Sequence, residues 1–214
     1  MNLLTDSILV LLILAGFLLL SSSRLSNCIK VVALQGLMVG LLPLSAGGAE
    51  LTYRIVAIAL VIAGTKGFVF PYLLSRTLRE SNIFKEAKPY VGYTASIFAG
   101  VLSLVASFWL DSRLNLPVAA SSRLVIPVAF SMMMTGILLI VGRRTAVNQV
   151  VGYLVMENGI YTFGLAIVRD VPLLVEIGVL MDMFVAVFVM GIAIYRINRE
   201  FDHIDSDQLT TLKG

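Results

Sequence analysis

Four ionisable side chains lie inside long apolar stretches of this sequence, where charged groups are rare. They are Lys66, Glu157, Glu176 and Asp182. A charge at the centre of a membrane helix costs at least ~2.5 kcal/mol on insertion scales, so such residues usually pair, line a polar cavity or carry protons. Burial away from water disfavours the charged forms of carboxylates and amines, so both can exchange protons near neutral pH. These four residues are therefore the candidates for proton relay or coupling.

Three of the four side chains are predicted to lie at a similar depth. Each is counted from the basic residue that bounds its apolar segment on one membrane face. The separations are ten positions for Lys66, thirteen for Glu157 and fourteen for Asp182. At ~1.5 Å per residue these depths agree within roughly 6 Å, near the bilayer centre. Whether Lys66 reaches Glu157 or Asp182 stays open. Glu176 is shallower and does not share a helix face with Asp182, six residues later.

Uncharged polar side chains accompany these charges. Asn158 follows Glu157, while Gln35 and Thr65 come from other helices, and with water they could hydrogen-bond in a chain between the ionisable groups. A static role is the alternative for the charges, because buried acid–base pairs also hold helices in register and join subunits. For Glu176, near a helix end, an ordinary interfacial charge is the alternative.

The composition places these residues in a membrane protein. The 214-residue chain is 58% hydrophobic and 14% charged, whereas a soluble domain is about 25% charged. Cys28 and His203 are each the single residue of their type, which excludes an internal disulfide and argues against a clustered metal site. No phosphate loop, catalytic triad or basic–aromatic stripe is present, so we expect no enzyme activity, no cofactor or metal, and no nucleic-acid partner.

Apolar segments of the length needed to cross ~30 Å of hydrocarbon predict an all-α, polytopic membrane protein with about seven transmembrane helices. The segments are residues 7–22, 28–44, 51–75, 90–110, 124–141, 148–168 and 171–195. Pro71 and Pro127 predict helix kinks whose freed carbonyls could bind water.

The basic residues predict the orientation of these helices. If the loops alternate sides, one side collects eleven Lys and Arg residues and the other four. The amino terminus is therefore predicted to lie outside and the carboxyl tail in the cytoplasm. We divide the chain into an N-terminal three-helix unit, residues 1–89, and a C-terminal four-helix unit with a short tail, residues 90–214.

The stretches that carry these charges, together with the carboxyl-terminal end of the chain, resemble a known family. Four of them are similar to hydrogenase-4 component E, a membrane subunit of formate hydrogenlyase-type complexes: Gly152–Gly159, Leu174–Gly178 followed by Asp182, Thr65–Lys66 and Leu209–Gly214. The resemblance covers the whole chain.

Over its last three helices, that family is in turn similar to the K-type subunit of complex I and of multisubunit sodium/proton antiporters. K-type subunits carry a membrane glutamate in each of two helices, and Asp182 falls at the register of the later one. The earlier one corresponds to a position near Leu154, whereas the acid here is Glu157. A shift of about one turn keeps the helix face.

The resemblance implies a non-catalytic membrane-arm subunit of a complex-I-like hydrogenase or dehydrogenase in the cytoplasmic (inner) membrane. Its partners would be antiporter-like and other membrane subunits, with redox chemistry in peripheral subunits, while its carboxylates and Lys66 would relay protons or the signal that drives pumping. Two alternatives stay open: a purely structural scaffold, and a small stand-alone ion transporter. Helices this apolar leave little room for a substrate path, which argues against the transporter.

Overall fold

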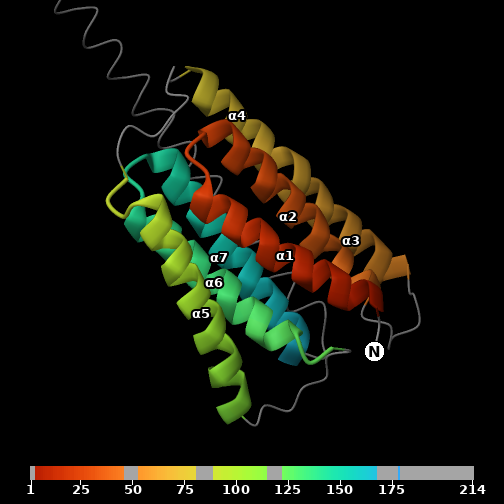
Figure 1. Cartoon of the computed structure of the whole chain (residues 1–214). Coiled ribbons are helices and arrows are strands. Elements are labelled where there is room, and N and C mark those ends of the chain that lie inside the picture. Colours follow the sequence, from red (N-terminus) through yellow and green to blue (C-terminus); the bar gives the residue numbers. More distant parts are fainter. Residues whose placement is uncertain (1–2, 46–52, 81–88, 115–121, 168–177, 179–214) are drawn as a thin grey trace, which may run out of the picture.

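The computed structural model describes residues 3–45, 53–80, 89–114, 122–167 and 178. Within these ranges the chain is helical and contains no strand. Five long α-helices and one helix in three parts make up the bundle (Figure 1). The long helices are α1 (Leu3–Ser21), α2 (Leu25–Ser45), α5 (Tyr93–Arg113), α6 (Val125–Gly142) and α7 (Ala146–Ile167). The three-part helix consists of α3 (Tyr53–Gly64), the π-helix η1 (Thr65–Val69) and α4 (Phe70–Glu80).

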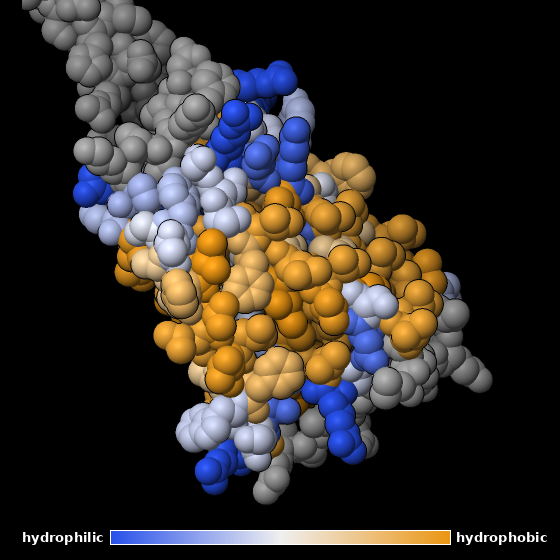
Figure 2. All heavy atoms as spheres, in the orientation of Figure 1, coloured by the Kyte–Doolittle hydropathy of each residue, from blue (hydrophilic) through white to orange (hydrophobic). Residues whose placement is uncertain are grey.

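Six helices in the described ranges are long and apolar enough to cross a membrane. They correspond to the first six predicted segments, and the predicted seventh, residues 171–195, lies outside the described residues. On the face shown in Figure 2, the middle of the bundle is apolar and hydrophilic residues gather towards its two ends. The chain is therefore an all-α, polytopic membrane protein. Its orientation in the membrane remains a prediction.

The helices pack side by side, and α6 and α7 share the most extensive interface among the described elements. Helix α1 packs against α2, α5 and α6, while α2 contacts α7 and all three parts of the broken helix (Figure 1). Helix α5 is the outermost, because only 17% of its span is buried within the bundle. Helix α2 therefore brings η1 and α7 together inside the bundle.

The break in the third membrane helix lies directly before a proline. The backbone N–H of Phe70 bonds the carbonyl of Thr65, five residues back, which is the spacing of a π-helix. Pro71 has no N–H to donate, and in a regular α-helix its ring would clash with the carbonyl four residues earlier. The distortion predicted at Pro71 thus takes the form of a π-turn that contains Lys66. Pro127 lies in the first turn of α6, where a helix needs no amide donor.

Glycines let two pairs of helices approach at backbone distance. A Cβ placed on Gly36 of α2 would lie 2.6 Å from the carbonyl oxygen of Lys66. A Cβ on Gly152 of α7 would lie 2.8 Å from the carbonyl oxygen of Gly136 on α6. Membrane helices associate largely through such close packing of small residues, because lipid supplies no hydrophobic drive between them. These contacts fix η1 against α2 and α7 against α6.

Candidate functional site: a buried lysine–glutamate pair

The structure brings Lys66 and Glu157 together inside the bundle. Lys66 Nζ donates a hydrogen bond to Glu157 Oε1 at 2.6 Å, which is also an ion-pair distance. Both residues are buried, with 4% and 1% of their surfaces exposed. Charge-assisted hydrogen bonds of this length are among the stronger polar contacts in proteins. The two side chains therefore lie at the same level of the bundle, while their depth in a membrane remains a prediction. Of the two acids left open, Glu157 is in contact with Lys66.

The position of Lys66 follows from the backbone that carries it. Lys66 is the second residue of η1, so the widened turn that precedes Pro71 contains the lysine. Gly36 admits the backbone of this turn against α2, where any larger side chain would overlap the Lys66 carbonyl. Single π-turns within α-helices occur frequently at functional sites. The lysine is thus held by local chain geometry as well as by its ion pair.

The position of Glu157 follows from the glycine face of α7. Gly152 and Gly159 both abut the α6 backbone, since a Cβ on either would lie 2.8 Å from a carbonyl oxygen of that helix. Glu157 is five residues after Gly152, which is about 140° around a helix of 3.6 residues per turn. With the glycines turned to α6, Glu157 points away from α6. That side of α7 meets α2 and the Lys66 segment.

Part of the hydrogen-bonding capacity at the pair is not used by the described residues. Glu157 Oε2 and the hydroxyl of Tyr161 are both buried and have no hydrogen-bond partner in the described part of the chain. The Tyr161 ring centroid lies 5.6 Å from Lys66 Nζ, within the range of a cation–π contact. Buried polar atoms in such positions commonly bind internal water. The pair therefore has the groups needed to accept a proton or a water molecule.

The three predicted supporting residues occupy different environments. Gln35 is fully buried and donates from Nε2 to the Leu12 carbonyl of α1 at 3.4 Å. Its Oε1 has no partner among the residues that the structure describes. Asn158 is buried next to Glu157. The hydroxyl of Thr65 instead bonds back to carbonyls of its own helix, one full turn earlier.

The remaining two predicted site residues, Glu176 and Asp182, lie outside the described residues. The geometry of the site is therefore that of the Lys66–Glu157 pair, with Tyr161 against the lysine and Gln35 and Asn158 buried in α2 and α7.

Among the described residues, sequence reasoning missed a second buried cation, Arg143, which is one of the eleven basic residues predicted on the cytoplasmic side. Only 2% of Arg143 is exposed. Its Nη2 donates to the Leu20 carbonyl at 2.6 Å, and its guanidinium lies 4.4 Å from the ring centroid of Tyr93. Arg144, its neighbour, is exposed and lies over the ring of Tyr90. No sequence pattern distinguishes the two arginines, because the tertiary packing of α1, α5 and α6 creates the difference.

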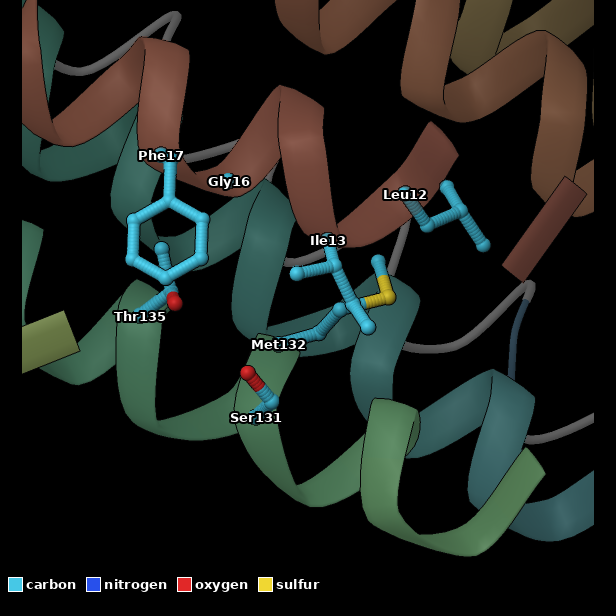
Figure 3. A pocket seen from close by; sticks show the side chains of 7 residues that line it. All are labelled: Leu12, Ile13, Gly16, Phe17, Ser131, Met132 and Thr135. Carbon is cyan, nitrogen blue, oxygen red and sulfur yellow. The ribbon is translucent and has the colours of Figure 1, made fainter. Parts of the chain in front are cut away.

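A small crevice lies between α1 and α6 (Figure 3). Its walls come from Leu12, Ile13, Gly16 and Phe17 of α1 and from Ser131, Met132 and Thr135 of α6. The volume of about 10 Å³ suffices for roughly one water molecule, far below the ~300 Å³ of a small ligand site. In the described ranges no three His, Cys, Asp or Glu side chains gather to hold a metal ion. The ion pair is therefore the strongest candidate site.

Comparison with known proteins decides the family. Hydrogenase-4 component E of Escherichia coli K12 is 33% identical over 152 residues, which cover 70% of this chain and 69% of that protein. The chain belongs to the hydrogenase-4 component E family. A second relative is the uncharacterized protein Rv0085 of Mycobacterium tuberculosis. It is 30% identical over 205 residues, which cover 94% of this chain and 92% of that protein.

The carboxyl-terminal part of the chain also matches a second family. Residues 124–214 fit the family model of NADH-ubiquinone/plastoquinone oxidoreductase chain 4L. No solved structure matches the chain. The resemblance inferred from the sequence is therefore confirmed, both for the chain and for its last part. The chain 4L match includes Glu157 but not Lys66.

Proposed function

We propose that this chain is a non-catalytic membrane-arm subunit of a complex-I-like redox enzyme, and that its Lys66–Glu157 pair takes part in proton translocation or its coupling. Family membership supports the first part, since the relatives are named as a hydrogenase component and an oxidoreductase chain. The single observation that carries the second part is a titratable ion pair buried inside a membrane bundle. Redox chemistry then belongs to partner subunits, and the complex lies in the cytoplasmic (inner) membrane.

The pair can convert a proton into an electrostatic change. In its ionised form, Glu157 balances the charge of Lys66 at 2.6 Å. A proton that arrives at Glu157 removes that balance, and the lysine charge then acts on other acids within reach, because coupled groups titrate together. Asp182, predicted at the same depth, would be such an acid. Glu176 would connect the route to water on the outer side, and Gln35 and Asn158 would hold water along it.

The pair also joins the two predicted units of the chain. Lys66 comes from residues 1–89 and Glu157 from residues 90–214, the unit that includes the chain 4L match. In this proposal, the N-terminal unit supplies the cation and the C-terminal unit supplies the acid. Antiporter-like and other membrane subunits would exchange the proton, or the signal, with this pair.

A structural scaffold is the second candidate function, and the close packing around the pair favours it. Buried acid–base pairs hold helices in register. Glycine contacts also fix the two segments that carry the Lys66–Glu157 pair, η1 against α2 and α7 against α6. A scaffold predicts that Asp182→Asn lowers the yield of the complex and leaves the activity of each assembled complex unchanged. A stand-alone transporter, by contrast, would move ions when this chain alone is placed in liposomes.

The test of the proposal is proton pumping by the assembled complex in membrane vesicles. Wild type is compared with Glu157→Gln and Asp182→Asn at matched levels of complex. Asp111→Asn is the control, because it removes the same charge near the end of α5, away from the pair. We expect both site variants to assemble and to lose most of their pumping, while the control pumps normally. Normal pumping by both site variants would reduce the pair to a structural contact.

A further inference from the structure

Tyr161 occupies a position beside the pair that the mechanism above does not use. It lies four residues after Glu157 on α7, so both side chains emerge from the same face of the helix. Tyr161 is 4% exposed, and its ring centroid lies 5.6 Å from Lys66 Nζ. The ammonium is thus within reach of both a carboxylate and the face of an aromatic ring.

The surroundings of the Tyr161 ring are apolar. The ring belongs to a buried cluster with Met38, Val39 and Ile62, among other apolar residues. A cation over an aromatic face is stabilised by the ring quadrupole, and the attraction is stronger when water is excluded. Unlike a second carboxylate, the ring provides this attraction without binding a proton. It therefore attracts the ammonium whether Glu157 is charged or neutral.

From this geometry we infer that Tyr161 is a positioning residue whose ring keeps the Lys66 ammonium in place when Glu157 takes up a proton. The inference rests on the proposed function of the pair. Protonation of Glu157 weakens the contact between its carboxyl group and Lys66, and an attraction that does not depend on that proton then helps to keep the ammonium in place. The ring holds Lys66 close enough for the ion pair to re-form when the proton leaves. The hydroxyl is dispensable in this role, since it has no hydrogen-bond partner among the described residues.

A series of phenylalanine analogues at position 161 separates this role from packing. Fluorine atoms withdraw electron density from the ring and weaken its attraction for a cation, while the ring keeps nearly the same shape. The series is Tyr161→Phe, followed by the mono-, di- and trifluorinated phenylalanines at the same position, in the full complex. The same analogues at Phe98, which is 68% exposed on α5, control for incorporation.

We expect Tyr161→Phe to pump like wild type and the fluorinated series to fall stepwise, by roughly threefold to tenfold in total. The Phe98 series should stay flat. Equal pumping by all position-161 analogues would show that the ring only packs. Loss of pumping by Tyr161→Phe itself would assign the role to the hydroxyl, and would equally overturn the inference.

A second readout distinguishes failure of this inference from failure of the proposed function. In complexes that carry Glu157→Gln, the ring should help to hold the ammonium, so fluorination should lower the unfolding temperature stepwise. In complexes that carry Lys66→Met, the same series should have no effect. This thermal result does not depend on pumping. Its absence overturns the inference, whereas its presence alongside normal pumping by Glu157→Gln overturns only the proposed function.

Discussion

Two buried cations of this bundle are stabilised in different ways. Arg143 donates to the Leu20 carbonyl in the last turn of α1 and lies against the Tyr93 ring. The final carbonyls of a helix have no helical donors and carry partial negative charge, so they attract a cation. Lys66 lies instead within a membrane span and is paired with the carboxylate of Glu157.

In the proposed function, the partner of a buried charge decides whether that charge can respond to a proton. The Leu20 carbonyl that accepts from Arg143 Nη2 binds no proton near neutral pH. A carboxylate can gain and lose a proton, so the surroundings of Lys66 can change. Burial alone therefore does not mark a functional charge, because both residues are almost fully buried. We propose that the carboxylate partner of Lys66 is what suits this cation to proton coupling.

The largest effect on stability is expected for Lys66→Met. The substitution leaves Glu157 buried without its ion-pair partner, and breaking a buried pair costs about 3–5 kcal/mol. Adding Glu157→Leu should recover most of this loss, because apolar replacement of both partners is often neutral. The measurement is the free energy of unfolding of the full chain in detergent micelles. Lys30→Met, at an exposed position of α2, is the matched control and should change stability by less than about 0.5 kcal/mol.

A smaller effect is expected for Arg143→Gln. The variant loses a charged hydrogen bond to Leu20 and the contact with Tyr93, which should lower the free energy of unfolding by about 1.5–3 kcal/mol. Arg144→Gln, at the exposed neighbouring position, should cost less than about 1 kcal/mol. If the comparison holds, each assembled Arg143→Gln complex pumps at the wild-type rate. Lost pumping with intact assembly would show that Arg143 is no mere structural cation.

The smallest of these stability effects is expected for Gly36→Ala. The added methyl would lie 2.6 Å from the Lys66 carbonyl oxygen, so the π-turn must move away from α2. Such overpacking costs about 1–3 kcal/mol, and it should reduce pumping because Lys66 moves with its backbone. Gly64→Ala is the matched control on the same membrane span, since a Cβ there meets nothing within 4 Å. Equal pumping by the two variants would contradict the role of the π-turn.

The sequence predicted the helices and the common level of Lys66 and Glu157 because both depend on local quantities. Apolar length alone locates the six spans, and counting residues from the basic ends placed Lys66 and Glu157 at one depth. The contact itself depends on how α2, η1 and α7 pack. Gly36 and Gly152 determine that packing, yet neither glycine is distinguishable by spacing from glycines elsewhere in the chain.

Two further features were beyond local reasoning. Pro71 predicted a distortion, but the choice of a π-turn depends on the neighbouring helix that receives the widened backbone. Arg143 adjoins a second arginine in a short connection, which is typical of a loop at the membrane surface. Its burial depends on a carbonyl of α1 and a ring of α5, residues more than forty positions away in sequence.

The most direct test of the central claim is proton pumping by complexes that carry Lys66→Met together with Glu157→Leu. This double variant removes both charges and leaves neither one unpaired. If the pair were purely structural, the variant should therefore pump protons as wild type does. We predict wild-type levels of assembled complex and of redox turnover, with pumping reduced to near background. Wild-type pumping by the double variant would contradict the account, and would make the Lys66–Glu157 pair a structural contact between two helices.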